Sequence, residues 1–309
     1  VGGILTNFLL LFAIRRFSRQ SVGTYKYLLA IFASFDIFLT IIHRLTNPVK
    51  VIKNAIVSLK LQTVVTIRIK EITGAYCAFF TVPFALMNIH FLYRFWAIRH
   101  PEKIILFSNK KFIALISMAP ISVFVSWHLI CTRIMSGAHD EIGTIRLYKE
   151  YFRRYGKKIR DGWILVNFSE EDGMRTLGFI SMLTLDVIMI GSFSIAITLA
   201  ILTYHYITLA DTKISSATIN LQFKLLIAVC AQTFVPLVFV YLPYMGVNNL
   251  AVLRVPAYPV DRVCMQLTAC FPLWDALIII VLIRDYREGV ISLVRKKKVI
   301  DTKTTVWKT

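Results

Sequence analysis

Three aspartates interrupt otherwise apolar stretches of this sequence, at Asp36, Asp186 and Asp275. An ionised carboxylate is costly in hydrocarbon, so a carboxylate within a membrane-spanning stretch is a functional candidate. We counted residues from the predicted cytoplasmic end of each stretch, with a rise of about 1.5 Å per residue. By this count Asn7, Asp36 and Asp275 all lie roughly 10 to 15 Å deep in the membrane. They would form a polar network that holds water or a cation and changes its hydrogen bonds as helices shift. In the alternative interpretation each side chain is satisfied separately, and the sequence leaves both open.

Motifs for catalysis and cofactor binding are absent from the sequence. It has no GxSxG, HExxH or phosphate-binding loop, and its histidines and cysteines lack metal-ligand spacing. We therefore predict a protein that is not an enzyme and has no cofactor or metal site. The net charge of +19 is spread over the segments between the apolar stretches, which favours membrane lipids as partners and argues against nucleic acid.

The apolar residues form seven blocks, which predict an all-α membrane protein, a single seven-transmembrane helix bundle. A helix needs about 20 apolar residues to cross a hydrocarbon core of roughly 30 Å. Buried helices of a soluble protein rarely exceed that length without charge several times over. The first block is short and the chain opens at Val1, so we expect the first helix to begin before this sequence. The blocks are 1–14, 27–43, 73–93, 112–132, 177–202, 225–247 and 263–283.

Basic residues near the ends of the first and last blocks indicate an amino terminus outside the cell. Three arginines follow the first block, and a basic run from Arg295 to Lys298 follows the last, so we expect residues 284–309 to form a cytoplasmic basic tail. Residues 284–298 read as an amphipathic helix on the anionic inner leaflet. Asn167 begins the pattern Asn-Phe-Ser in the fourth connection, which predicts glycosylation outside the cell.

Two of the five cysteines, Cys77 and Cys131, fall near the predicted outer ends of their helices. A disulfide between them is one interpretation, and small buried side chains are the other. Their separation cannot be read from the sequence.

Several short signatures occur in order along the chain, and together they resemble the Str superfamily of nematode serpentine chemoreceptors. The resemblance extends from the first block to the tail. Its signatures are GTYKYLL at 23–29, HFLYRF at 90–95, QFKL at 222–225, QTFVP at 232–236, FPLWD at 271–275 and Tyr-Arg at 286–287.

This resemblance implies a G-protein-coupled olfactory receptor in the plasma membrane, at the ciliary membrane of sensory neurons. Its partners would be a small-molecule odorant and a heterotrimeric G protein. By analogy with other seven-helix receptors, Tyr93 and Arg94 would contact the G protein, and the Asn7, Asp36 and Asp275 layer would be a sodium and water network. The chain departs from that pattern, since no acidic residue precedes Arg94, the seventh block lacks NPxxY, and the loop 133–175 has no cysteine.

A ligand pocket is expected between the outer halves of the third, fifth, sixth and seventh helices. Its aromatic and weakly polar lining would suit a small apolar ligand. The expected lining residues are Phe79, Phe80, Pro83, Asp186, Tyr241, Tyr244 and Gln266.

Two other functions remain as alternatives. A ligand-gated cation channel with seven helices of inverted topology would place Asn167 in the cytosol, where it cannot be glycosylated. A transporter would show inverted repeats, and the sequence has no convincing internal repeat.

Overall fold

The computed structural model describes most of the helical blocks and parts of their connections. It gives no description of several loops and of the end of the tail. The described residues are 2–18, 25–46, 48–53, 56–61, 69–135, 145, 148–149, 152–153, 156, 164–167, 174–209, 216–243, 245–246, 249, 260–293 and 295.

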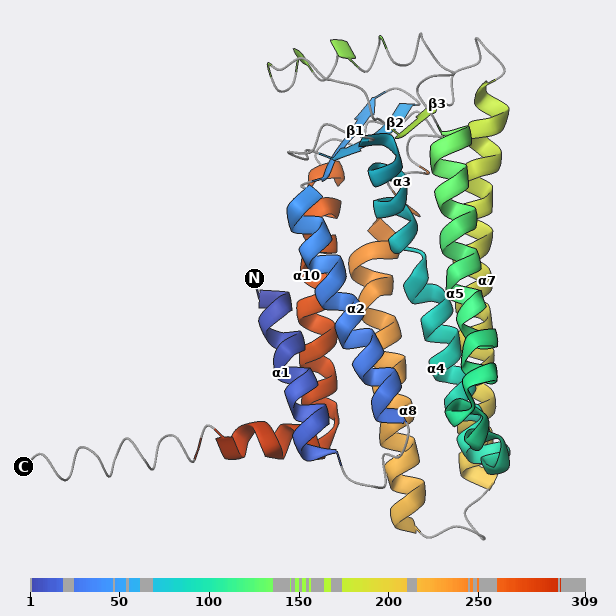
Figure 1. Ribbon diagram of the computed structural model, residues 1–309, viewed down its shortest axis with the longest axis vertical. Coiled ribbons are helices and arrows are strands. Elements are labelled where there is room, and N and C mark those ends of the chain that lie inside the picture. Colours follow the sequence, from blue (N-terminus) through green and yellow to red (C-terminus); the bar gives the residue numbers. More distant parts are fainter. Residues whose placement is uncertain are drawn as a thin grey trace, which may run out of the picture.

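Long helices run beside one another and form a bundle (Figure 1). A helix lies over each of the seven apolar blocks. These helices are α1 (Gly2–Phe17), α2 (Tyr25–Thr46), α3 (Ile69–Phe79), α4 (Val82–Arg99), α5 (Lys110–Leu129), α7 (Met174–Leu209), α8 (Ser216–Pro236) and α10 (Val260–Leu282).

Five helical stretches are long and apolar enough to cross a membrane by themselves. A sixth candidate is Gln266–Leu282 of α10, together with the helix Arg284–Leu293 that follows it. The first block corresponds to α1, which has 16 residues and is shorter than a full span. The five stretches are Tyr25–Leu45, Glu71–Arg99, Lys110–Ile134, Gly178–Leu209 and Gln222–Tyr241.

Breaks in the helices occur beside prolines and at π-helical turns. The third block divides into α3 and α4 at Thr81, two residues before Pro83, and the Thr81 hydroxyl donates a hydrogen bond to the Ala78 carbonyl (2.7 Å). Pro236 ends α8, and the π-helical turn η6 (Leu237–Tyr241) follows it. A second π-helical turn, η3 (Ile130–Ile134), continues α5. Proline removes a backbone donor and favours such changes in helix geometry.

One end of the bundle carries a three-stranded antiparallel sheet, which the helix-only prediction did not include. Its strands are β1 (Pro48–Lys53), β2 (Ile56–Leu61) and β3 (Ile164–Asn167), in the order β1-β2-β3. The pairing of Ile56 with Asn167 joins the second connection to the fourth. We call this the sheet end of the bundle (Figure 1).

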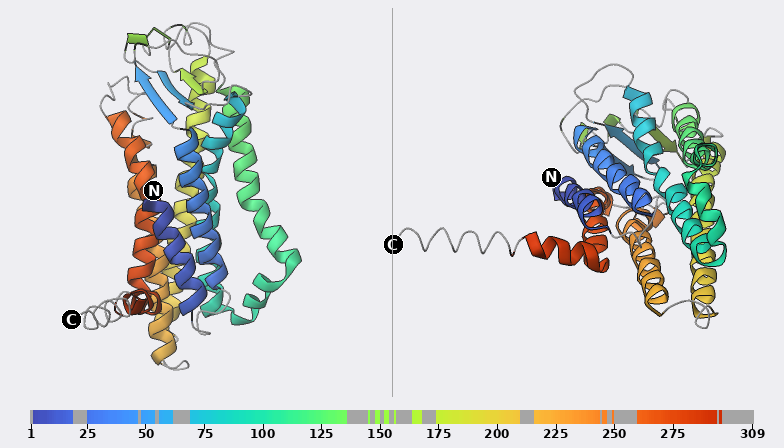
Figure 2. Two further views of the ribbon diagram at one scale, coloured as in Figure 1. Left: turned by 60° about the vertical axis from the view of Figure 1, so that its left-hand side comes forward. Right: turned by 60° about the horizontal axis from the view of Figure 1, so that its bottom comes forward.

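The opposite end carries the helix Arg284–Leu293, and we call it the tail end. This helix is bent by 97° from α10 and runs outward from the end of the bundle (Figure 2). Tyr286 is fully buried, and its hydroxyl is 2.8 Å from the Ser18 hydroxyl. Gly289 lies against Phe17 so closely that a Cβ atom there would clash with the ring. The glycine therefore allows the amphipathic segment to approach α1.

Candidate functional site

The structure brings two of the intramembrane carboxylates together. Asp36 on α2 and Asp275 on α10 are 1% and 2% exposed, and their carboxyl groups lie within hydrogen-bonding range of one another. Gln232 on α8 donates from Nε2 to Oδ2 of Asp275 (3.4 Å). We call Asn7, Asp36, Gln232 and Asp275 the acidic cluster.

Asn7 joins α1 to α10 at Pro272, about one helical turn before Asp275. Its Nδ2 donates to the carbonyl oxygens of Gly3 (2.9 Å) and Pro272 (2.8 Å), and the side chain is fully buried. Gly3 allows this approach, because a Cβ atom there would lie 3.3 Å from Pro272. Asn7 is therefore held by backbone carbonyls, while Asp36 and Asp275 face each other.

The acidic cluster has more acceptors than donors. One oxygen of each member is buried and has no hydrogen-bond partner in the described part of the chain. Unpaired buried acceptors are costly, and a shared proton, water or a small cation can satisfy them. Among the described residues, no group of three His, Cys, Asp or Glu side chains forms a metal site. The oxygens are Asn7 Oδ1, Asp36 Oδ2, Gln232 Oε1 and Asp275 Oδ1.

Arg94 on α4 is buried near the tail end, with 2% of its surface exposed. Its Cζ atom lies 3.4 Å from the centroid of the Tyr25 ring, and its Nη1 donates to Gln222 Oε1 on α8 (3.3 Å). Nε and Nη2 are buried without a hydrogen-bond acceptor, and no described carboxylate forms an ion pair with the guanidinium. We call Tyr25, His90, Arg94 and Gln222 the arginine cluster.

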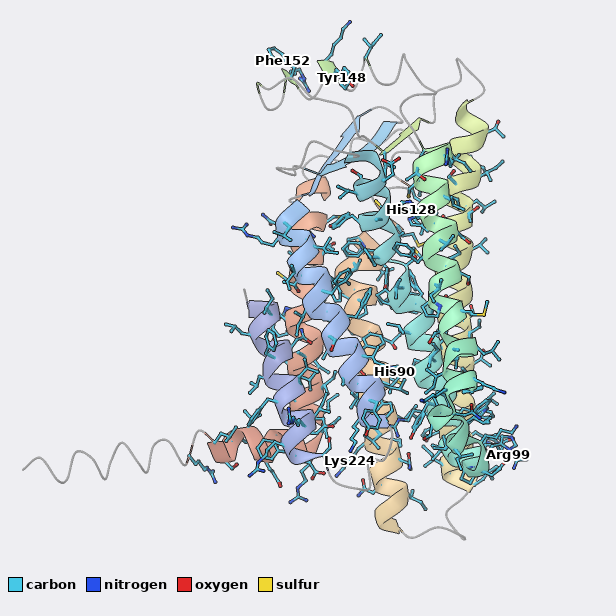
Figure 3. All side chains as sticks on the ribbon, in the orientation of Figure 1. His90, Arg99, His128, Tyr148, Phe152 and Lys224 are labelled. Atoms are coloured by element: carbon cyan, nitrogen blue, oxygen red, sulfur yellow. The ribbon has the colours of Figure 1, made fainter. Side chains whose placement is uncertain are left out.

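His90 is the member of the arginine cluster that lies one turn of α4 before Arg94, in the interior of the bundle (Figure 3). Its Nδ1 is 3.4 Å from the Tyr25 hydroxyl, and its ring packs edge-on against Phe32, with centroids 4.7 Å apart. Tyr93, the other residue assigned to G-protein contact, is buried and packs edge-on against Phe107 at 4.9 Å.

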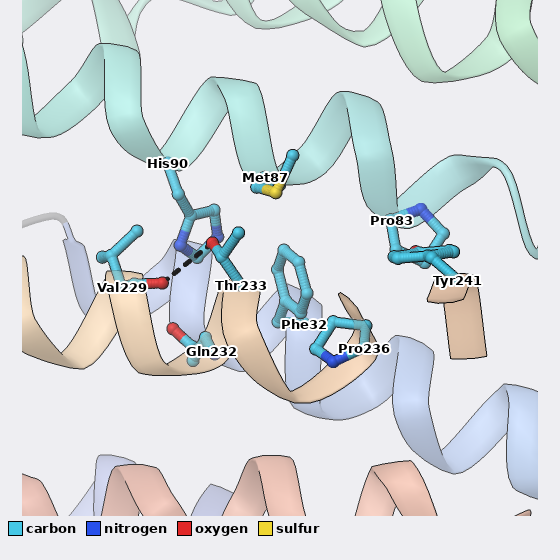
Figure 4. Close-up of a pocket in the computed structure, with 9 residues that line it drawn as sticks. All are labelled: Phe32, Pro83, Met87, His90, Val229, Gln232, Thr233, Pro236 and Tyr241. Atoms are coloured by element: carbon cyan, nitrogen blue, oxygen red, sulfur yellow. Dashed lines mark hydrogen bonds between the residues drawn. The ribbon is translucent and has the colours of Figure 1, made fainter. Parts of the chain in front are cut away.

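A small cavity in the bundle interior connects the surroundings of Gln232 with those of His90 (Figure 4). Its free space is enough for about one water molecule. Side chains from α2, α4, α8 and η6 surround it. They are Phe32, Pro83, Met87, His90, Val229, Gln232, Thr233, Pro236 and Tyr241.

A larger cavity of about 230 Å³ lies between α2 and α10, on the sheet side of the acidic cluster. Phe80 is the one residue of the expected ligand pocket that lines it. It adjoins the start of α1, where Gly3 contacts Thr40 and Pro272. Its lining is Leu39, Thr40, His43, Arg44, Phe80, Thr268, Ala269, Phe271 and Pro272.

The other expected pocket residues have different surroundings in the described part of the chain, and their role in a ligand pocket stays a prediction. Phe79 packs against Phe38 and Phe124, with centroids 4.7 Å apart in both pairs. Asp186 is partly exposed, Gln266 is exposed, and Tyr244 lies outside the described residues. Pro83 and Tyr241 share the small cavity of Figure 4, and Phe80 lines the larger one.

Cys77 and Cys131 meet near the sheet end, with their thiols in hydrogen-bonding range, and both are free thiols in this structure. Their helices approach closely at Gly74, where a Cβ atom would lie 2.5 Å from Thr132 Cγ2. A disulfide between them stays a prediction. Asn167 is the last residue of β3, and its glycosylation stays a prediction as well.

Two charged groups outside the spans lie at the tail end. Hydrogen bonds from its own backbone amide and from His100 lower the pKa of the exposed Glu102. Glu288 pairs with Arg284 and raises the pKa of that guanidinium.

The apolar face of the tail helix is partly covered. Leu293 is 40% exposed, and Val290 is partly buried. Tyr286 and Val290 therefore pack against the bundle core, and Leu293 is the exposed member of this face.

Sequence comparisons give a consistent result over nearly the whole chain. The family model for serpentine-type 7TM GPCR chemoreceptors of the Str group matches residues 1–291. Serpentine receptor class r-10 of Caenorhabditis briggsae is 28% identical, covering 96% of this chain and 88% of the relative. The class r-10 receptor of Caenorhabditis elegans is 26% identical, covering 90% and 84%. Class J-38 of Caenorhabditis elegans is 23% identical, covering 72% and 69%.

Proposed function

Since the chain belongs to the Str family of serpentine seven-transmembrane G-protein-coupled chemoreceptors, we propose that it binds a small apolar odorant and activates a heterotrimeric G protein. Members of this family are multi-pass integral membrane proteins and are not enzymes. The observation that carries the proposal is the hydrogen bond from Arg94 to Gln222, which joins α4 to α8 at the tail end. A cation held between two helices becomes available to a partner when those helices separate.

The proposed orientation places the sheet end outside the cell and the tail end in the cytosol. The helix Arg284–Leu293 would then lie on the cytoplasmic leaflet, and Asn167 in β3 would face the outside. The resemblance to chemosensory receptors favours the ciliary plasma membrane of a sensory neuron as the location. Loss of a glycosidase-sensitive mass shift in Asn167→Gln would support this orientation. A tail-end tag that is accessible on intact cells would contradict it and favour the inverted channel.

The odorant is proposed to bind within the bundle on the sheet side of the acidic cluster. Phe80 supports this placement because it lines the larger cavity there, and Pro83 and Tyr241 line the small cavity beside Gln232. The remaining proposed contacts are Phe79, Asp186, Tyr244 and Gln266. The cavity of Figure 4 has room for about one water molecule, so a ligand there requires the helices to part. A ligand shifts that equilibrium only through tighter binding to the parted arrangement.

The acidic cluster is proposed as a site for water and a sodium ion. Four unpaired oxygens in one buried group support this assignment. Two carboxyl groups in contact repel each other when both are ionised, and a bound cation reduces that repulsion.

The experiment is a nucleotide-exchange assay on membranes that contain the receptor and a G protein, with a panel of small volatile compounds. Arg94→Ala should abolish the response to any active compound. Arg99→Ala is the matched control, because Arg99 is an exposed arginine on the same helix (Figure 3). A normal response from Arg94→Ala at equal surface expression would contradict the proposed coupling role.

A further inference from the structure

Arg94 has an unusual environment for a buried cation. Its guanidinium lies against the face of Tyr25 at 3.4 Å, and the Tyr93 ring centroid is 5.7 Å away. Tyr25 is fully buried, so this contact is shielded from water. Cation–π attraction is strongest where the pair is desolvated.

No negative charge offsets this cation among the described residues. The contacts described for Arg94 are the Tyr25 and Tyr93 rings and the Gln222 amide, and none of these residues has a carboxylate. The ion pairs of His100 with Glu102 and of Arg284 with Glu288 do not include Arg94. The aromatic face and one amide oxygen are therefore the principal described contacts that hold the guanidinium.

We infer that Tyr25 and Gln222 are positioning residues that hold Arg94 in the resting arrangement, and that the Tyr25 ring determines how much the receptor signals without ligand. Tyr25 begins α2, Arg94 lies on α4 and Gln222 on α8, so the contact joins three helices. This inference rests on the coupling role proposed for Arg94. It goes further by naming neutral side chains as the groups that restrain the arginine.

The two contacts should differ in strength. The Arg94–Gln222 hydrogen bond, at 3.3 Å, is longer than the usual 2.7–3.2 Å range for N–H···O bonds. The Tyr25 ring covers the guanidinium face and excludes water from it. We therefore expect removal of the ring to change basal signalling more than removal of the amide.

Ligand-free nucleotide exchange on membranes with the full chain and its G protein tests the inference. Tyr25→Leu should raise basal exchange about fivefold, because it removes a desolvated cation–π contact. Tyr25→Phe retains the ring and should stay within about twofold of the wild type. Tyr27→Leu is the matched control, since Tyr27 is 62% exposed on the same helix, and should change nothing. Unchanged exchange in Tyr25→Leu, or equal exchange in Tyr25→Leu and Tyr25→Phe, would overturn the role of the ring.

Two substitutions test Gln222. Gln222→Glu places a carboxylate beside Nη1 and should lower basal exchange about tenfold, because a buried ion pair restrains the arginine more firmly than an amide does. Gln222→Ala should raise it about twofold. A rise in Gln222→Glu would overturn the assignment of Gln222 as a contact of the resting arrangement.

A distance measurement separates this inference from the proposed function. Spin labels at Arg99→Cys and Lys224→Cys, both at the tail end (Figure 3), report the separation of α4 and α8. Cys77, Cys230 and Cys270 are replaced by Ser in this background. Tyr25→Leu should populate longer distances, and Tyr25→Phe should not. If no receptor form activates a G protein, the proposed function fails. The distances still test the inference separately. Longer distances in Tyr25→Leu alone would support the restraint by Tyr25, and equal distances in all forms would overturn it.

Discussion

The acidic cluster and the arginine cluster share the helices α2 and α8 but lack opposite kinds of hydrogen-bonding group. The acidic cluster has four buried oxygens without a donor, and the arginine cluster has two buried N–H groups without an acceptor. Gln232 and His90, one from each cluster, line the small cavity between them. The anionic and the cationic groups therefore lie in one bundle without forming an ion pair.

This difference indicates how each cluster can be satisfied. Carboxylates can share a proton or bind a cation, so the acidic cluster can be completed by a small ion. A guanidinium keeps its charge and has five donors, so the arginine cluster can be completed only by acceptors or π faces. An ion exchanges with solvent, whereas a ring face changes only when a helix moves. We therefore expect the contacts of the acidic cluster to change with the salt that is present. We expect the contacts of the arginine cluster to change when the helices move.

The largest effect is expected when the charge is removed from the arginine cluster. Arg94→Met should reduce signalling to the background of cells without receptor, because the cation proposed to contact the G protein is gone. The same change should raise the free energy of unfolding by about 1 to 4 kcal/mol, since a well-packed apolar side chain avoids burying a charge. Thermal unfolding in detergent measures the stability of Arg94→Met against that of the wild type. A less stable variant would contradict the conclusion that two N–H groups of Arg94 lack acceptors.

The next effect concerns sodium at the acidic cluster. In sodium chloride the wild type should unfold at a higher temperature than in choline chloride of equal ionic strength. At a sodium concentration tenfold above Kd, linkage contributes about 1.4 kcal/mol. Asp36→Asn combined with Asp275→Asn should abolish this difference, and Gln222→Ala in the arginine cluster should retain it. A sodium effect that survives in the double variant would place the ion elsewhere.

A smaller effect is expected at the edge of the acidic cluster. Asn7→Leu removes the hydrogen bond to the Pro272 carbonyl and leaves that acceptor without its side-chain donor. The expected loss is about 1 to 2 kcal/mol in the free energy of unfolding. Thr6→Ala is the control, because the Thr6 hydroxyl bonds only to its own helix, at Gly2 and Gly3. Equal losses in both variants would show that the α1–α10 contact adds nothing.

The smallest effect is expected beside the arginine cluster, at Tyr286. Tyr286→Phe removes the 2.8 Å contact with the Ser18 hydroxyl and keeps the buried ring. We expect a loss of about 0.5 to 1 kcal/mol and a change in basal signalling below twofold. Unfolding in detergent and ligand-free exchange measure the two quantities. A large rise in basal exchange would show that the phenol hydroxyl also restrains Arg94.

Much of the bundle could be predicted from the length of the apolar blocks, because a bilayer sets the length of a spanning helix. The sheet was missed, although alternating residues such as those of 48–53 (PVKVIK) are a weak strand signal. The pairing of β2 with β3 joins residues more than 100 positions apart. The sequence of a loop does not indicate such a distant partner. The break at Thr81 had a clearer signal in Pro83.

The residues of the two clusters could likewise be predicted only in part from the sequence. Counting along helices placed Asp36 and Asp275 at one depth, and the structure places them in contact. Gln232 could have been found by the same count, since it is a polar residue within the sixth block. Tyr25 had no comparable signal, because an aromatic residue at a helix start is most simply explained as an interface residue.

By itself, the sequence determined the membrane-spanning class and the absence of an acidic residue next to Arg94, and it predicted a common depth for Asp36 and Asp275. These are local properties of composition and helical rise. Only the tertiary structure decided which faces meet, so that Asp36 faces Asp275 and Arg94 lies against Tyr25. The rotation of each helix about its axis depends on packing against all its neighbours, and no single helix contains that information.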